Sequence, residues 1–322
     1  SIKEKHMIDF TNCTEKINKF RGSEKKKTIE YNGKTYLLKF PDPTREKGKS
    51  ISYINNTISE YIGCKIYESA GIETQNVILG TYVNDSGVSK IVCACEDFEK
   101  EDMKLYEFKN ISLSDVEEHI PKNLDLYQVL DTIDNSSLIK NKQVVRERFW
   151  DMFVVDTFIG NKDRHLGNWG FLGNEEKGII DLAPVYDCGS CLFPLLSENE
   201  ILNMPVVEYK NQALNVYSCY RIEGKKINAT QYILSGENEE CNEALNRIMP
   251  NLQMDKVNEI IDNIEVISEG KKNFYKSILE IRYRDILNKE YEKLYLENAM
   301  KQCMKRTAAR TPERKLDKEL DR

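Results

Sequence analysis

The sequence predicts an α+β fold built from two lobes, a β-rich amino-terminal lobe over residues 7–97 and a mainly helical carboxy-terminal lobe over residues 98–297. Strand-like runs and one amphipathic helix fill the first lobe, whereas helical patterns dominate the second. The length of 322 residues, of which 40% are hydrophobic, provides enough apolar material for two such cores.

The clearest element of the first lobe is a hairpin. Residues 27–31 and 34–40 have strand-forming sequences, and Asn32-Gly33 between them tolerates the positive φ of a tight type I′ turn. Pro41 ends the second strand. Lys39 therefore lies near the end of a predicted strand.

One helix and a second hairpin complete this lobe. Apolar residues recur at helical spacing over residues 51–67, which predicts a single amphipathic helix with Glu60 near its middle. Residues 77–83 and 88–95 are β-rich, and the turn-forming residues 84–87 separate them. The predicted order is therefore strands, one helix, strands.

The second lobe is predicted to be mostly helical, with one short β section. A polar loop over residues 160–168 precedes that section, and polar loops beside short strands often carry function. Helices are predicted over residues 124–134, 143–158, 241–249, 254–264 and 272–296, and strands over residues 169–172 and 178–182.

Both ends of the chain are expected to lie outside the two lobes. Residues 1–6 precede Met7, and the His6-Met7 pair is typical of a cloning junction, so we interpret these residues as a cloning remnant. Residues 298–322 are expected to form a charged tail that is mobile or a frayed extension of the last helix, because residues 301–322 hold eight basic and four acidic side chains with almost no apolar periodicity.

Composition argues against several classes of protein. The 47 Lys and Arg against 53 Asp and Glu give a net charge of −6, so direct binding of nucleic acid through a basic surface is not predicted. The sequence shows no apolar stretch suited to a membrane span or a signal peptide, and we expect a cytoplasmic protein. Its nine cysteines are irregularly spaced, unlike a secreted disulfide framework.

Polar residues in the order used by kinases carry the functional prediction. Asp163 and Asn168 have the spacing of kinase catalytic loops, in which the Asp accepts the proton of the substrate hydroxyl and the Asn binds magnesium. Asp187-Cys-Gly189 fits the pattern that supplies a second metal ligand. Lys39 on a strand and Glu60 on the next helix are the pair that holds the ATP phosphates. Four such parts in this order predict a protein-kinase-like fold and phosphoryl transfer.

Longer motifs resemble those of the HipA-like serine/threonine kinases. The loop Gly160-Asn-Lys-Asp-Arg-His-x-x-Asn168, the segment Ala183–Asp187 and the strand end Leu38–Pro41 carry this resemblance. The segment Phe149–Phe153 reads nearly as in the compact, cell-translocating kinase (CtkA) branch of that family. The resemblance covers residues 7–296.

The resemblance implies a role for each of the five polar residues. Asp163 is implied to be the catalytic base, and Asn168 and Asp187 are implied to be the ligands of Mg²⁺. Lys39 is implied to contact the phosphates of ATP, oriented by Glu60. Phosphoryl transfer then proceeds mostly by positioning and charge neutralisation.

The resemblance also implies a nucleotide-binding surface. Backbone groups of Glu96 and Phe98, in the connection between the lobes, are expected to contact adenine. The family's phosphate-covering loop has one glycine here, and Gly22, Ser23 and Lys25 are expected to cradle the phosphates. Ser23 follows Gly22 instead of preceding it, so the serine that is autophosphorylated in some relatives has no clear match.

The expected activity is the ATP- and Mg²⁺-dependent transfer of a phosphoryl group to a Ser or Thr hydroxyl of a protein, with autophosphorylation as a further expectation. The resemblance implies a toxin or an effector that is secreted or translocated without a classical signal peptide. The partner would be an antitoxin or a host protein. We find no match to the extra amino-terminal subdomain with which longer members engage an antitoxin, so dependence on that partner is in doubt.

Three other hypotheses compete with a protein kinase. The Cys188-x-x-Cys191 and Cys93-x-Cys95 pairs could form a zinc or redox site, although Cys-x-Cys in a buried strand does not fit a structural zinc site. The Asp163 loop also resembles phosphoinositide kinases, which gives a lipid kinase as the enzymatic alternative. A pseudokinase that binds nucleotide and serves as a binding module is the alternative without turnover.

Overall fold

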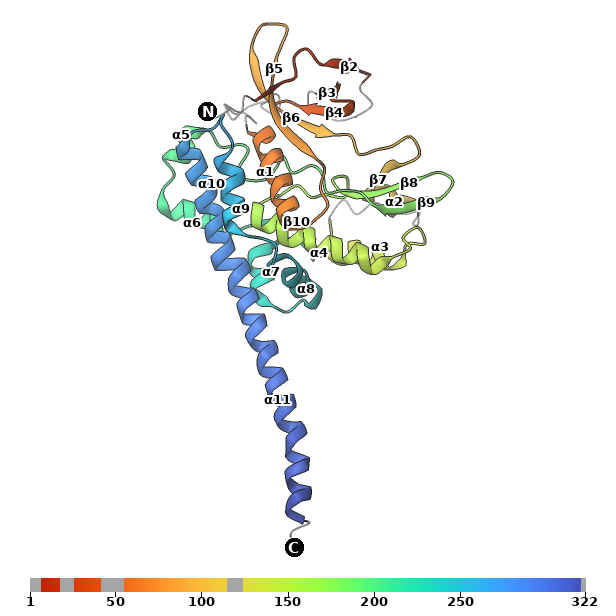
Figure 1. The fold of residues 1–322 in the computed structure, drawn as a ribbon, viewed down its shortest axis with the longest axis vertical. Helices are drawn as coiled ribbons and strands as arrows, with labels where there is room; N and C mark the ends of the chain where they lie inside the picture. The colour runs from red at the N-terminus through yellow and green to blue at the C-terminus, as the bar shows by residue number, and fades with distance from the viewer. Residues whose placement is uncertain (1–6, 18–25, 42–54, 115–123, 320–322) are drawn as a thin grey trace.

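The structure is a computed structural model that describes residues 7–17, 26–41, 55–114 and 124–319. It has two lobes, a curved β-sheet with one helix and a larger, mainly helical lobe from which helix α11 projects (Figure 1). The predicted fold class is confirmed. In the described ranges, no helix combines the length and the hydropathy needed to cross a membrane.

The first lobe contains one six-stranded sheet, with the strand order β1-β5-β6-β4-β3-β2. Neighbouring strands are antiparallel except β1 and β5, which are parallel. The turn between β3 and β4 has positive φ at Asn32 (50°) and Gly33 (75°), as the predicted tight hairpin requires. The strands are β1 (Ile8–Asp9), β2 (Thr14–Lys16), β3 (Lys26–Tyr31), β4 (Lys34–Lys39), β5 (Val77–Val83) and β6 (Ser89–Glu96).

Helix α1 (Asn56–Ser69) packs on β5 and β6 and links the sheet to the second lobe (Figure 1). The first part of the predicted helix, residues 51–54, lies outside the described residues. The buried side chains of α1 belong to the same hydrophobic core as those of the helical lobe. A smaller core elsewhere in the sheet contains Phe10, Leu38 and Phe40. The core around α1 therefore joins the face of β5 and β6 to the second lobe.

The second lobe is arranged around helix α4 (Lys142–Ile159), whose carboxy-terminal half is buried on all sides. Two small sheets flank it: β7 (Lys104–Glu107), β8 (Gly170–Asn174) and β9 (Gly178–Leu182) form one, and β10 (Tyr217–Ile222) and β11 (Lys225–Asn228) form the other. The other helices before the last long segment are α2 (Phe108–Ser114), α3 (Leu126–Asn135), α5 (Glu198–Leu202), α6 (Val206–Leu214), α7 (Ala229–Ser235), α8 (Glu239–Ile248) and α9 (Met254–Asp262).

The last long segment differs from the helix predicted over residues 272–296. It consists of α10 (Glu269–Arg282), a π-helical turn η1 (Tyr283–Asn288) and α11 (Lys289–Glu319). Helix α11 continues into residues 298–319, for which the sequence left open a mobile tail or a frayed extension of the last helix. These residues are rich in Ala, Lys, Arg, Glu and Met, which favour helix even without an apolar face to bury.

Candidate active site

The fold brings three predicted site residues from distant parts of the chain into contact. The Nζ atom of Lys39, at the end of β4, lies 2.8 Å from Oε2 of Glu60 on α1 and 3.2 Å from Oδ1 of Asp187. The side chain of Glu60 is fully buried and that of Lys39 is 10% exposed, whereas that of Asp187 is 42% exposed. Lys39 thus connects the buried carboxylate of Glu60 to the accessible carboxylate of Asp187.

The three side chains of this triad stabilise one another's charged forms. Burial opposes the charge of Lys39, but the carboxylates of Asp187 and Glu60 outweigh it and raise the pKa of Lys39 well above its usual value. Burial likewise opposes ionisation of Asp187, and the Lys39 ammonium overcomes it, so the pKa of Asp187 lies below its usual value. Lys39 is therefore a fixed cation beside a fixed anion at neutral pH.

Glu60 also fixes the segment that follows Asp187. Its Oε1 atom accepts a hydrogen bond from the backbone N–H of Cys188 at 3.1 Å, while Oε2 pairs with Lys39. A Cβ built on Gly189 would lie 3.1 Å from Oε2 of Glu60, which is closer than most real Cβ contacts. The buried carboxylate of Glu60 therefore fixes the positions of β4, α1 and the Asp187 segment relative to one another.

The loop after α4 places Asp163 and Asn168 together. The Asn168 side-chain amide donates a 2.7 Å hydrogen bond to the backbone carbonyl of Asp163, and Oδ1 of Asn161 accepts one from the Asp163 N–H at 3.2 Å. The Asp163 carboxylate is 46% exposed and lies 4.0 Å from Nε2 of His165. The loop backbone is thus fixed while the Asp163 carboxylate stays accessible to a substrate.

Arg164 links this loop to the Asp187 segment. Its guanidinium pairs with Asp156 at 2.9 Å and donates hydrogen bonds to the carbonyls of Asn168 and Tyr186 and to the sulfur of Cys188. The side chain is only 3% exposed. Arg164 therefore shapes the site and does not face a substrate.

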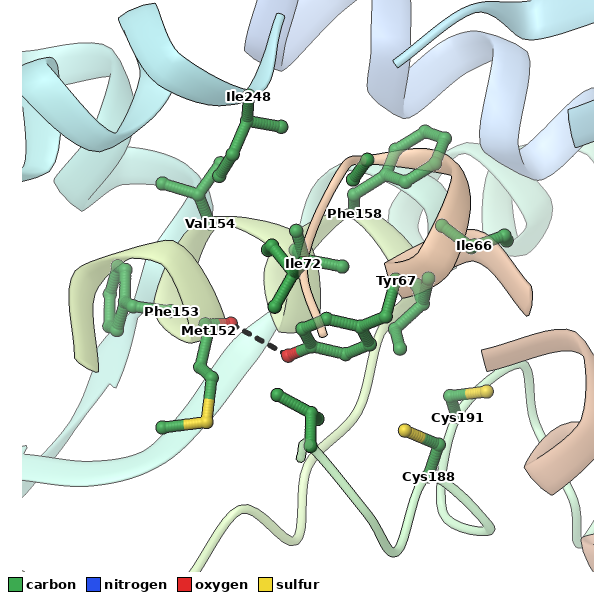
Figure 2. Packing of buried hydrophobic residues seen from close by; sticks show 14 of the residues in the cluster. Ile66, Tyr67, Ile72, Met152, Phe153, Val154, Phe158, Cys188, Cys191 and Ile248 are labelled. Atoms are coloured by element: carbon green, nitrogen blue, oxygen red, sulfur yellow. Dashed lines mark hydrogen bonds between the residues drawn. The ribbon is translucent and has the colours of Figure 1, made fainter. Parts of the chain in front are cut away.

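The Asp156 carboxylate, on α4, extends this network to helix α1. It accepts hydrogen bonds from the hydroxyl of Tyr67 at 2.8 Å and from the Asn161 side chain at 3.0 Å. Figure 2 shows Tyr67 within the core, with the contact between its hydroxyl and the Met152 carbonyl dashed and with Cys188 nearby. Helix α1 is thus connected to both loops of the site through buried polar contacts.

The two residues predicted to contact adenine, Glu96 and Phe98, both lie within the described residues. The backbone N–H of Glu96 donates to the carbonyl of Asn76 at 2.8 Å, so it is already engaged. The ring of Phe98 lies 5.9 Å from that of Tyr186, centroid to centroid. Both adenine contacts stay predictions. The predicted phosphate-cradling residues Gly22, Ser23 and Lys25 lie outside the described residues.

Comparison with protein families decides which group of proteins has this arrangement. Residues 8–267 match the family described as the HipA-like C-terminal domain. The chain belongs to this family. The resemblance predicted from the Asp163 loop and the Asp187 segment is confirmed.

Two findings place this HipA-like protein near one relative. It is 38% identical over 295 residues to the serine/threonine-protein kinase CtkA of Helicobacter pylori strain J99, covering 87% of this chain and 86% of the relative. The crystal structure of the Helicobacter pylori proinflammatory kinase CtkA superposes with a TM-score of 0.82 at 37% identity, covering 89% of this chain and 97% of that one. The predicted assignment to an enzyme of the kinase class is confirmed.

The competing zinc hypothesis finds no support in the geometry of the cysteines. Cys93, Cys95, Cys188 and Cys191 are buried free thiols. Across the part of the chain that the structure describes, no group of three or more His, Cys, Asp or Glu side chains is placed to hold a metal ion. Cys188 contacts Arg164 instead.

Sequence reasoning missed Asp156 and Tyr67 of this HipA-like site. Both lie in helices that pack as core, and nothing in their local spacing identifies them as partners of Arg164. One signal was present: Asp156 is the single charged residue in the apolar run 152–159. A lone carboxylate in such a run needs buried partners, because burying an unpaired charge is costly.

Proposed function

We propose that the protein transfers the γ-phosphoryl group of ATP to a Ser or Thr hydroxyl of a protein, assisted by Mg²⁺. The observation that carries this proposal is the contact of Lys39 with both Glu60 and Asp187 at the end of the loop network that includes Asp163. The name of the relative CtkA, a serine/threonine-protein kinase, supports the choice of a protein hydroxyl.

Asn168 and Asp187 have the right donor chemistry for Mg²⁺. The amide nitrogen of Asn168 is used by the Asp163 carbonyl, so its oxygen is the free end for a metal, and Asp187 offers an ionised carboxylate. Two hard oxygen ligands suit an ion that keeps several waters and binds through substrate phosphates. When bound, Mg²⁺ would neutralise charge on the phosphates.

The chain's own groups supply the rest of the chemistry. The Lys39 ammonium binds phosphate oxygens, and Glu60 holds that ammonium in place. The Asp163 carboxylate orients the attacking hydroxyl and accepts its proton, from a loop backbone that Asn161 and Asn168 hold fixed. These roles match those predicted from the sequence.

Two substitutions distinguish the roles of the two aspartates. Asp163→Asn removes the proton acceptor and leaves the phosphate contacts in place, so we expect phosphotransfer to fall by about 10²–10⁴ while nucleotide affinity changes little. Asp187→Asn weakens the metal site, so we expect loss of Mg²⁺-dependent nucleotide binding as well. Asp181→Asn, at an exposed position on β9, is the matched control.

The measurements are transfer of labelled phosphate to protein in a cell lysate and calorimetric titration with a nonhydrolysable ATP analogue and Mg²⁺. Near wild-type transfer by Asp163→Asn would contradict the proposed base. Nucleotide binding without any transfer by the wild-type protein would favour a pseudokinase. Labelled species identified in the lysate would also test our further proposals of autophosphorylation and of a toxin or effector role.

A further inference from the structure

A pocket apart from the candidate active site lies between the lobes, and none of the predicted catalytic residues lines it. We call it the second pocket. Its volume is 540 Å³, which is in the range of sites for small molecules. Its walls come from the first turn of α1, the adjacent part of β6, the start of α5 and the residues around the start of α10 (Figure 1 shows these elements). The apolar part of the lining includes Ile58, Ile91 and Ile267.

A buried lysine in this pocket forms no ion pair with any carboxylate among the described residues. Lys271, in the first turn of α10, is only 5% exposed, and its ammonium donates to the neutral Oδ1 atom of Asn55. Its Nζ atom also lies 5.7 Å from the centroid of the Tyr275 ring, which offsets part of the cost of burying the charge. Burial lowers the pKa of Lys271 to about 8, and the nearby Glu198 offsets this only in part. A buried charge without a counter-charge is costly, which favours an anion in the pocket.

The side chain of Asn55 is used to hold Lys271 and not to cap a helix. Asn55 occupies the N-cap of α1, yet its side chain caps nothing: it accepts from Lys271 and donates to the Leu196 carbonyl. Lys90 adds a second cation to the lining, whereas the hydroxyl of Ser197 is engaged with Glu200 in the N-cap of α5. The exposed carboxylate of Glu198 disfavours a dianion.

We propose that this pocket binds a small organic monocarboxylate, with the carboxylate on the Lys271 ammonium and an aliphatic body against Ile58 and Ile267. Such a ligand would contact both lobes at once. Ile58 precedes Glu60 by two residues on α1, so the ligand would contact the helix that holds the ion pair of the active site.

The test uses octanoate as the probe, with octanol and inorganic phosphate as comparators that lack the charge or the aliphatic body. Thermal unfolding is followed with the nucleotide cleft saturated by a nonhydrolysable ATP analogue, so that binding at that cleft is excluded. We expect octanoate alone to raise the melting temperature. For Lys271→Met, the octanoate concentration that gives the same rise in melting temperature should be higher by about tenfold or more, because a charge-assisted hydrogen bond is lost. For Lys225→Met, at an exposed position on β11, that concentration should stay as in the wild type.

A second measurement on the wild-type protein keeps the test independent of variant folding. Acetic anhydride acylates neutral amines, and peptide mass spectrometry reads the rate at Lys271 and at Lys225. Octanoate should slow acylation of Lys271 and leave Lys225 unchanged. The proposal is overturned if octanol is as effective as octanoate, if Lys271→Met responds like the wild type, or if octanoate protects neither lysine.

Discussion

The buried pair of Asp156 and Arg164 gives the sharpest quantitative prediction. The carboxylate of Asp156 is 8% exposed and the Arg164 side chain 3%, and the two lie 2.9 Å apart. Asp156→Asn keeps the shape of the side chain and removes its charge. The Arg164 guanidinium, which still contacts the Asn168 carbonyl, is then buried without a counter-charge. Breaking a buried pair in this way costs about 3–5 kcal/mol, and we expect this loss in the free energy of unfolding.

The chain offers a matched control in a surface pair. Asp134 is 49% exposed and lies 2.8 Å from Arg146, which also pairs with Glu240. Asp134→Asn therefore leaves no cation buried alone, and exposed pairs contribute about 0–1 kcal/mol. The two substitutions make the same chemical change, so their difference reports the cost of disturbing the buried site, which includes the Asp156 contacts with Tyr67 and Asn161.

Urea denaturation of five proteins tests this prediction: the wild type, Asp156→Asn, Arg164→Met, the double variant of these two positions, and the control Asp134→Asn. We expect the double variant to be more stable than Asp156→Asn, because it removes the isolated cation. Equal losses for Asp156→Asn and Asp134→Asn would refute the reasoning. Strictly additive losses in the double variant would show that the pair does not couple.

Three further predictions concern α1, the second pocket and the ion pair. Gly63→Ala should lower the melting temperature and phosphotransfer despite a gain in helix propensity, since the added Cβ would lie 2.5 Å from Cβ of Cys188. Lys271→Met should be more stable than the wild type at pH 7, because below about pH 8 only the wild type carries a buried charge at this position. This advantage should shrink as the pH rises from about 8 to 10 and Lys271 loses its proton in the folded protein. A constant difference in melting temperature across this range would contradict the prediction. Lys39→Met should abolish phosphotransfer and destabilise the fold more than Glu60→Gln does. Lys39→Met leaves the buried Glu60 carboxylate without its cation, whereas Glu60→Gln removes that carboxylate's charge. Activity assays and thermal melts of both variants test this.

The predicted site could be located from the sequence because each part has a local signal. Lys39 lies at the end of a strand that the Asn32-Gly33 turn identifies, and Glu60 lies on the one helix between strands. Asp163 and Asn168 share a loop of fixed spacing. The structure brings Lys39 and Glu60 together with Asp187, as the order of these elements predicted.

Other features depend on contacts that local pattern cannot report. Asn55 and Lys271 are 216 residues apart in the chain, and each reads as an ordinary polar residue at a helix start. Helix α11 illustrates the opposite limit, because apolar periodicity detects helices that bury a face. A helix with little to bury, such as residues 298–319, is invisible to that criterion even though its residues favour the helical state.

Glu60 shows how a correctly predicted residue can have a wider role than its motif assigns. The sequence predicts it as the partner of Lys39, and that contact is present. Its second oxygen binds the backbone N–H of Cys188, a contact that no side-chain motif can encode. Any displacement of α1 would therefore move Lys39 and the Asp187 segment together. Helix α1 shares its core with the helical lobe, and its first turn lines the second pocket. A ligand in that pocket would therefore be coupled to the active site through the packing of α1.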